Sequence, residues 1–164
     1  MWEVTVANRG DLAPWIELVS ALRWNFPGLE TAAQLDAYQE TVRKHIGRKS
    51  ALCAKEDGRI VGVLLFSKKR NQLCCMAVRP EYRRQGVATR LVERMLDCLD
   101  PARDVIVTTF REEDEKGGAP RALYQKLGFI PDALGIEYDC PIQRFVRPGK
   151  PAKRRPVKQK GSIA

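Results

Sequence analysis

The chain has 164 residues, of which 44% are hydrophobic and 30% are charged, and its formal net charge is +9. These values fit one globular domain with a real core, and no apolar run approaches the roughly 20 residues that a membrane helix needs. The N-terminus has no charged start followed by an apolar segment, so we predict no secretory signal and expect a cytoplasmic protein without membrane association.

The positive charge is concentrated at the C-terminus. Seven of the 29 basic residues lie between Arg147 and Lys160, where no acidic residue occurs, so the rest of the chain has 22 basic against 20 acidic residues. We therefore predict a single domain over residues 1–147 and a basic, disordered tail over residues 148–164. A solvated tail of this kind usually serves solubility, and an anionic partner is the alternative.

The cysteines and the single histidine limit the chemistry available to the chain. Five cysteines are an odd number, they form no CxxC pair, and most lie in apolar segments, which favours buried free thiols over disulfides or a zinc site. No metal is expected. His45 lies in a helical pattern, which gives a Ser-His-Asp or Cys-His site little support, and the adjacent Cys74 and Cys75 indicate strand packing.

The N-terminal third predicts one strand and two helices. Residues 2–7 alternate like a strand, and Asp11 can cap a helix that has Pro14 in its first turn. The segment "RWNFPG" at residues 23–28 then breaks the chain. A second helix follows Thr31, where "TAAQ" has the spacing of a capping box.

Three strands and a long helix come next. Strands are predicted at residues 51–55 and 59–66, joined by the strong hairpin turn Asp57-Gly58, and at residues 73–78. A helix with an apolar face follows at about residues 86–99.

The C-terminal part alternates strands and a helix. It predicts a β-branched strand at residues 104–110, a helix at residues 119–127 ended by Gly128, and short strands at residues 136–138 and 142–146. The complete order is β-α-α-β-β-β-α-β-α-β-(β). This order indicates an α+β or mixed α/β domain, because the strict alternation of a doubly wound sheet is missing.

Arginines and a glycine crowd the start of the long helix. The pattern R-x-x-G-x-A places Arg83, Gly86 and Ala88 at a helix N-terminus, where unpaired amides and a partial positive charge favour an anion. Gly86 would let a phosphate approach the backbone. Solvated arginines before an ordinary turn are the alternative interpretation, and the spacing matches neither the P-loop nor the dinucleotide-binding glycine motif.

The segment from "LCCMAVRPEYRRQGVATRLVERML" through a β-branched strand to "APRALYQKLGF" resembles the GNAT superfamily of acyl-CoA N-acetyltransferases. The family's pyrophosphate motif [RQ]-x-x-G-x-[GA] matches Arg83, Gly86 and Ala88, and its later helix signature matches residues 122–129. The resemblance implies a central, mostly antiparallel mixed sheet with helices on both faces, and acetyl-CoA as co-substrate without a metal.

The resemblance also implies which residues bind the co-substrate. The end of a strand would pair with the pantetheine arm, the amides of residues 84–89 would hold the pyrophosphate, and Tyr124 would lie near the thioester sulfur. Many members carry asparagine near position 117, where this chain has Gly117. The implied co-substrate residues are Met76, Ala77, Val78, Arg83, Arg84, Gln85, Gly86, Val87, Ala88, Thr89 and Tyr124.

The implied reaction is direct transfer of an acetyl group to a primary amine in a ternary complex, without a covalent enzyme intermediate. Tyr124 is the candidate general acid, with ring packing as its alternative role, and the Val78 backbone N–H is the candidate oxyanion donor. Glu112 is the preferred candidate base among the carboxylates that follow the fifth strand, although "REEDEK" also fits a solvated loop, and Glu137 lies on a late strand. Gln72 cannot act as a base.

The acceptor is expected to be a small-molecule or protein amine that binds near the first two helices. Trp24, Phe26 and Glu30 would form an aromatic and acidic lip for a cationic amine, or they serve as core and cap residues. Two other functions stay open: a non-catalytic, regulatory acyl-CoA-binding module, and a nucleic-acid-associated protein acting through the tail, which lacks interleaved aromatic residues. An exposed final strand leaves room for a homodimer.

Overall fold

The structure is a computed structural model that describes residues 2–150 of the chain. The predicted basic tail lies outside the described residues from residue 151 onward. In chain order the strands and α-helices are β1 (Glu3–Val6), α1 (Leu12–Ala21), α2 (Ala32–Gly47), β2 (Ala51–Glu56), β3 (Arg59–Ser67), β4 (Gln72–Val78), α3 (Val87–Cys98), β5 (Val105–Phe110), α4 (Gly118–Lys126), β6 (Ile130–Glu137) and β7 (Cys140–Arg147). This order confirms the predicted α+β fold.

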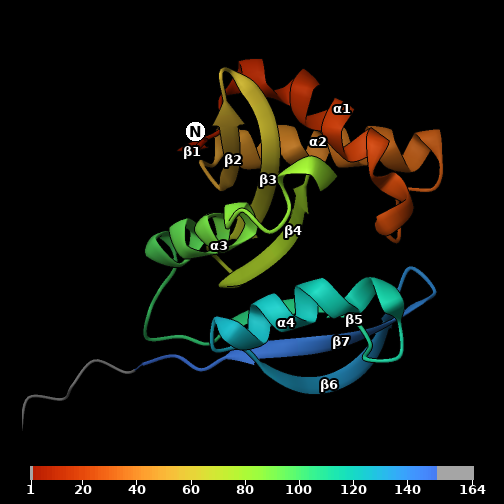
Figure 1. The fold of residues 1–164 in the computed structure, drawn as a ribbon, viewed down its shortest axis with the longest axis vertical. Coiled ribbons are helices and arrows are strands. Elements are labelled where there is room, and N and C mark those ends of the chain that lie inside the picture. The colour runs from red at the N-terminus through yellow and green to blue at the C-terminus, as the bar shows by residue number, and fades with distance from the viewer. Residues whose placement is uncertain (1, 151–164) are drawn as a thin grey trace, which may run out of the picture.

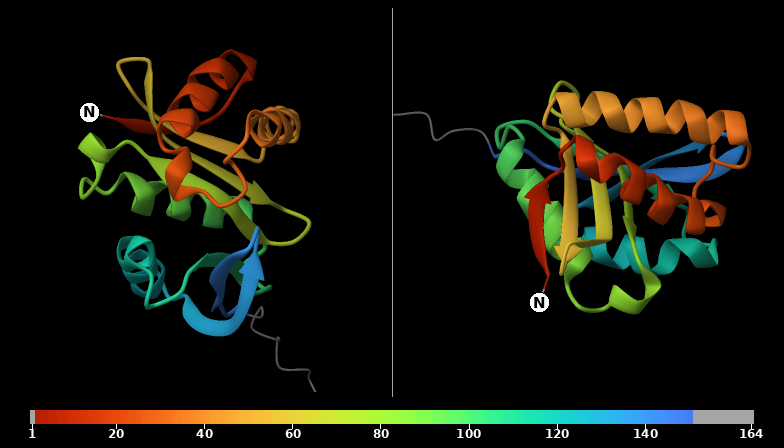
Figure 2. Two further views of the ribbon diagram at one scale, coloured as in Figure 1. Left: turned by 90° about the vertical axis from the view of Figure 1, so that its right-hand side faces the viewer. Right: turned by 90° about the horizontal axis from the view of Figure 1, so that it is seen from above.

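One mixed sheet organises the described chain, with the strand order β1-β2-β3-β4-β5-β7-β6. Neighbouring strands are antiparallel except β4 and β5, which are parallel because the α3 crossover connects them (Figure 1). Helices α1 and α2 cover one face of the sheet, whereas α3 and α4 lie on the opposite face (Figure 2). Each face of the sheet therefore has its own apolar core.

The two cores separate the residues of each strand by parity, as alternation along a strand requires. The core under α3 and α4 includes Phe66, Leu91 and Phe145, and the core under α1 and α2 includes Trp15 and Leu65. None of the helices in the described part of the chain has both the length and the apolar character needed to span a membrane.

Several turn and cap signals are confirmed. Asp57 and Gly58 have φ values of 50° and 79°, the left-handed pair that a tight hairpin requires. Thr31 and Gln34 form a reciprocal capping box, with Gln34 N–H donating to Thr31 Oγ1 (3.1 Å) and Thr31 N–H donating to Gln34 Oε1 (3.0 Å). Gly128 ends α4 with a φ of 90°.

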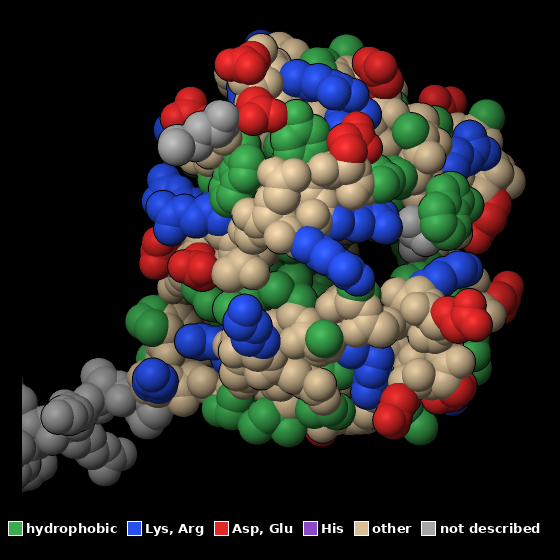
Figure 3. Space-filling model, viewed as in Figure 1, with side chains coloured by type: hydrophobic (Ala, Val, Ile, Leu, Met, Phe, Trp, Pro, Cys, Tyr) green, Lys and Arg blue, Asp and Glu red, His purple; other side chains and the backbone are tan. Residues whose placement is uncertain are grey.

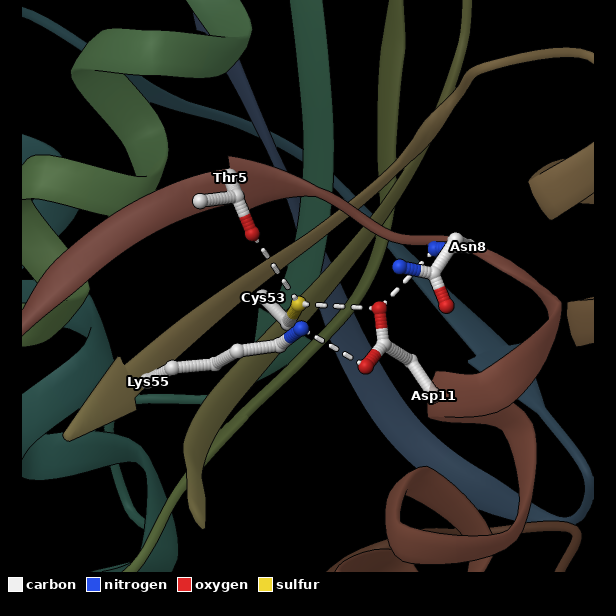
Figure 4. A network of polar contacts seen from close by, with 5 residues as sticks. All are labelled: Thr5, Asn8, Asp11, Cys53 and Lys55. Atoms are coloured by element: carbon white, nitrogen blue, oxygen red, sulfur yellow. Dashed lines mark hydrogen bonds and ion pairs between the residues drawn. The ribbon is translucent and has the colours of Figure 1, made fainter. Parts of the chain in front are cut away.

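Asp11 is the N-cap residue of α1, as predicted, but its carboxylate makes no cap hydrogen bond to the helix. It is only 7% exposed, accepts a hydrogen bond from Asn8 N–H (2.9 Å) and pairs with Lys55 Nζ (2.8 Å). Cys53 and Thr5 complete this polar network (Figure 4). Asp11 therefore ties the start of α1 to the sheet, since a partly buried carboxylate is stabilised better by an ammonium group than by amides alone.

The last two strands are longer than predicted. We expected residues 136–138 and 142–146, but β6 begins at Ile130 and β7 continues to Arg147. The sequence pattern did not predict the first part of β6, because Pro131 and Gly135 are residue types depleted in strands. They are tolerated here because β6 is an edge strand whose pairing with β7 is irregular between Pro131 and Leu134.

The Asn71 side chain links the start of β4 to the start of β5 through hydrogen bonds. Its side chain has no solvent exposure and donates to the carbonyls of Asp100 (3.1 Å), Arg103 (3.4 Å) and Asp104 (3.2 Å). Its Oδ1 accepts from Asp100 N–H (3.0 Å), and its backbone carbonyl accepts from Ile106 N–H (3.2 Å). The φ of Asn71 is 52°, a conformation that asparagine tolerates better than most residues.

We expect Asn71→Gly to lower the free energy of unfolding by about 2–3 kcal/mol, because glycine keeps the left-handed backbone but leaves buried polar groups unpaired. Asp57→Gly is the matched control, since Asp57 has a similar φ and an exposed side chain, and should cost about 0.5 kcal/mol or less. Urea denaturation measures both values. Equal, small losses would contradict a clamping role for the Asn71 side chain.

Candidate active site

A cleft opens in the middle of the sheet because β4 and β5 separate soon after they meet. Their ladder contains the single residue pair Gln72–Ile106, and the remaining residues of β4 have no partner on that side among the described residues. The molecule is hollowed between the half that carries β1–β4 and the half that carries β5–β7, with Lys and Arg side chains at the margins (Figure 3). This cleft exposes an internal strand edge.

The alternation of backbone groups decides which residues of β4 face the cleft. Arg79 N–H donates to Val61 carbonyl on β3 (2.8 Å), so the backbone groups of Val78, and by alternation those of Met76, point away from β3 into the cleft. Ala77 differs, because it is paired toward β3 and its side chain is buried under α1 and α2. Among the three predicted strand residues, Met76 and Val78 thus offer free hydrogen-bonding groups.

The predicted anion site lies where the chain leaves the cleft edge and enters α3. Gly86 is the N-cap with a φ of 83°, and nothing lies within 4 Å of the place where a Cβ atom would be. Arg84 also has a left-handed φ, 62°. Since Arg90 N–H makes the first helical bond to the Gly86 carbonyl, the amides of residues 87–89 have no partner within the helix. This turn therefore presents several N–H groups in a concave arrangement.

The side chains of this segment divide into two groups. Arg83, Arg84 and Gln85 are exposed, whereas Val87 is buried against the sheet and contributes only its backbone to the turn. Ala88 and Thr89 are partly buried.

Tyr124 extends from α4 toward the cleft. Its ring is 5% exposed and packs against Phe129 and Phe145, with centroids 5.6 Å and 6.2 Å away. Burial raises the pKa of the Tyr124 hydroxyl above its usual value, and nearby Cys75 raises it further. The hydroxyl makes no hydrogen bond with the described residues. The hydroxyl oxygen is not completely buried, because no fully buried side-chain oxygen in the described residues lacks a partner. The phenol therefore remains protonated, and its interaction with Cys75 places it close to β4.

Sequence analysis gave Tyr38 no role beyond the apolar face of its helix, but the structure places its hydroxyl against Cys75 on β4. Trp15 Nε1 donates to the Tyr38 hydroxyl (3.0 Å), which lies 3.5 Å from Cys75 Sγ, and burial raises the pKa of Cys75 to about 11. Tyr38 on α2 and Tyr124 on α4 thus approach Cys75 from opposite faces of the sheet. Tyr38 occupies an apolar position of the α2 pattern, so only the tertiary structure distinguishes it from an ordinary core residue.

The three predicted acceptor residues lie in different environments. Trp24 is 65% exposed, whereas Phe26 packs against the core under α1 and α2. The Glu30 carboxylate accepts from Gly28 N–H at 3.2 Å, which stabilises its own loop.

The predicted base Glu112 lies in the turn after β5, where its side chain is exposed and forms no hydrogen bond or ion pair with the described residues. A neighbouring hollow of about 450 Å³ contains Glu113, Asp114 and Glu115, with Arg111, Lys116 and Pro141 at its walls. Its lining includes neither Tyr124 nor the turn at Gly86. Glu112 itself is not among the residues that line this hollow, so its role as the base stays a prediction.

A protein-family model described as the acetyltransferase (GNAT) domain matches residues 47–131, just over half of the chain. These residues contain the open edge of β4, the turn at Gly86 and Tyr124. The chain belongs to the GNAT acetyltransferase family. The resemblance inferred from its two motifs is thus confirmed, and the protein is an acetyltransferase.

Solved GNAT structures share the complete fold at low sequence identity. A GNAT-family acetyltransferase from Bacillus cereus has a TM-score of 0.71 at 21% identity, over 92% of this chain and 99% of that chain. The ribosomal-protein-S18-alanine N-acetyltransferase of Escherichia coli has a TM-score of 0.68 at 16% identity, over 94% and 99%. The PaiA N-acetyltransferase of Thermoplasma acidophilum, solved with coenzyme A, has a TM-score of 0.60 at 16% identity, over 88% and 98%.

No curated protein with which the sequence was compared matches it.

One departure from the GNAT pattern has a packing reason. A Cβ atom at Gly117 would lie 3.0 Å from the Arg111 carbonyl and 3.1 Å from Phe110 Cβ. The asparagine that many members carry near this position would not fit without a shift of the backbone of β5 and η4 (Glu115–Gly117). The chain therefore has no side chain at this position.

We expect Gly86→Glu to weaken acetyl-CoA binding by 100-fold or more in isothermal titration calorimetry, because a carboxylate would occupy the place of a phosphate. Gly86→Ala is the matched control: it carries the same left-handed backbone strain, about 1–2 kcal/mol, without the charge. It should weaken binding less than 10-fold. Similar effects of the two substitutions would contradict an anion site at this turn.

Proposed function

We propose that the protein is an N-acetyltransferase that moves an acetyl group from acetyl-CoA directly to a primary amine. One observation carries this proposal: the unpaired edge of β4 runs from the amide-rich turn at Gly86 toward the free hydroxyl of Tyr124. A long donor with a phosphate end, an amide-containing arm and a reactive thioester end requires this sequence of groups.

The donor end of the cleft suits the chemistry of coenzyme A. The pyrophosphate would accept hydrogen bonds from the amides of residues 87–89, with Arg83 and Arg84 adding charge at the margin. The pantetheine amides would pair with the backbone of Met76 and Val78 as an added strand does. The complex of the T. acidophilum neighbour with coenzyme A supports this use of the fold.

The chemistry begins with a neutral acceptor. An amine of pKa ~10.4 costs about 4–5 kcal/mol to deprotonate at pH 7, so a base must take its proton. The nitrogen then attacks the thioester carbon, and the Val78 N–H stabilises the oxyanion. When the tetrahedral intermediate collapses, the C–S bond breaks, the thiolate takes a proton from Tyr124, and the nitrogen loses its second proton, which returns to the Tyr124 phenolate directly or through solvent. The products are an amide and coenzyme A.

The raised pKa of Tyr124 fits a proton donor. Because burial favours the neutral phenol, the group stays protonated at pH values where an ordinary tyrosine begins to ionise. A non-catalytic acyl-CoA-binding module would have no need for an unpaired hydroxyl at this place, so we favour the enzyme. All five cysteines are free, which suits a reducing compartment such as the cytoplasm.

The test is a coenzyme A release assay with acetyl-CoA and a panel of amines that includes polyamines, amino acids, lysine peptides and peptides with free N-termini. We expect transfer to at least one class, confirmed by mass spectrometry of the acetylated product. Tight acetyl-CoA binding without transfer to any amine would favour the non-catalytic module and contradict this proposal.

Tyr124→Phe should lower kcat about 10- to 100-fold with little change in the Kd for acetyl-CoA, less than many general acids contribute because a thiolate leaves readily. Since its pKa is raised, loss of the Tyr124 proton should not lower wild-type kcat below about pH 10. Equal kcat for Tyr124→Phe and the wild type would contradict the acid role.

A further inference from the structure

Glu137 lies at the end of β6, and its carboxylate reaches β5. Glu137 Oε2 accepts a hydrogen bond from Thr108 Oγ1 at 3.2 Å, although the two residues are 29 positions apart. The hairpin between β6 and β7 therefore extends over β5 and holds a carboxylate against it. This contact gives Glu137 an anchor that the described structure does not give to Glu112.

The strand register places this contact beside the closed end of the cleft. Thr108 lies two residues beyond Ile106, which forms the last pair with Gln72 on β4. In a regular parallel pair, the residue of β4 at the level of Thr108 would be two positions beyond Gln72. The register shift of β4 after Leu73 adds one residue to this count, so Cys75 lies at about the level of Thr108. Thr108 and Cys75 thus border the cleft on its two sides, at similar depth.

The parity of the strands places Glu137 on the face opposite to Tyr124. Val105 and Val107 belong to the core under α3 and α4, so Thr108 points to the other face of the sheet. Cys75 packs on that other face too. Tyr124, in contrast, belongs to the core under α3 and α4. A thioester that lies along β4 would therefore have the phenol on one face and the carboxylate on the other.

The same hairpin also contacts the loop before α2. The ring of Tyr138 packs on Gly28, where a Cβ atom would lie 2.9 Å from the ring carbons. Gly28 belongs to the connection that carries the exposed Trp24. The hairpin and this loop together border the approach to Glu137, with two exposed aromatic rings, Trp24 and Tyr138, that suit an ammonium group.

We propose that Glu137 is the general base for the acceptor amine and that Thr108 positions its carboxylate; this inference rests on the proposed acetyl transfer. The ammonium group of the acceptor gives one proton to the Glu137 carboxylate, directly or through one water, and the freed lone pair forms the C–N bond. The base and the acid then act from opposite faces, so the amine enters from the side of α1 and α2.

The charged neighbours of Glu137 leave its carboxylate available. Arg144 lies directly across from Thr108 in the register of β5 and β7, but its guanidinium pairs with Asp132 at 3.6 Å. Arg111 donates to the carbonyls of Gly135 and Ile142.

The experiment measures kcat as a function of pH for Glu137→Gln, with the best amine found for the wild type. Glutamine has nearly the same shape and can still accept from Thr108, so only the base is removed. We expect kcat near pH 7 to fall 100-fold or more and to rise with pH up to the pKa of the amine, ~10.4 for a lysine-type group. Asp139→Asn, a neutralised neighbour at the hairpin tip, should stay within about threefold of the wild type.

Thr108→Val tests the positioning role. It should lower kcat about 10-fold, and Thr108→Ser should restore it, with the Kd for acetyl-CoA and the melting temperature unchanged in all variants. A wild-type rate and pH profile in Glu137→Gln would overturn the inference while leaving acetyl transfer intact. Absence of acetyl transfer by the wild type itself would overturn the proposed function, and the role of Glu137 with it.

Discussion

The parallel contact between β4 and β5, limited to the pair Gln72–Ile106, is the constraint on which the site depends. If the two strands were paired along their length, the amides and carbonyls of β4 would be hydrogen-bonded within the sheet, as nearly all buried backbone groups are. Asn71 keeps the closed end closed, because its buried side chain bonds to the loop that leads into β5. The open end can then offer free strand groups to a ligand without loosening the sheet.

The separation of β4 and β5 also places different functional groups on the two faces of the sheet. The face of α3 and α4 carries the amide-rich turn at Gly86 and the phenol of Tyr124, which suit the donor. The face of α1 and α2 carries the carboxylate of Glu137 and the exposed ring of Trp24, to which the proposal assigns the acceptor. Each face has its own core, and in the proposed reaction the two substrates meet at the gap between β4 and β5.

The sequence predicts the features that depend on local physics. Hairpin, capping and helix-end signals at Asp57-Gly58, Thr31 and Gly128 act within a few residues, and the order of elements follows from periodicity. The turn at Gly86 is equally local, whereas the candidate role of Tyr124 came from the family resemblance. Features that depend on distant partners were not predicted. The Asp11 carboxylate pairs with Lys55 and makes no cap hydrogen bond to α1, and β6 contains a proline and a glycine that an edge strand tolerates. Glu137 gains its anchor from Thr108, 29 residues earlier, and no sequence pattern reports such a contact.

Amide hydrogen exchange of Val78 and Arg79 tests the account most directly, because these neighbours differ only in the direction of their N–H groups. Arg79 N–H is bonded to β3, so its exchange should be slow with and without acetyl-CoA. Val78 N–H faces the cleft, so its exchange should be fast in the free protein and at least 10-fold slower when acetyl-CoA is bound. Val78 exchange that is already slow without ligand, or unchanged when acetyl-CoA is bound, would contradict the assignment of the β4 edge as the donor site.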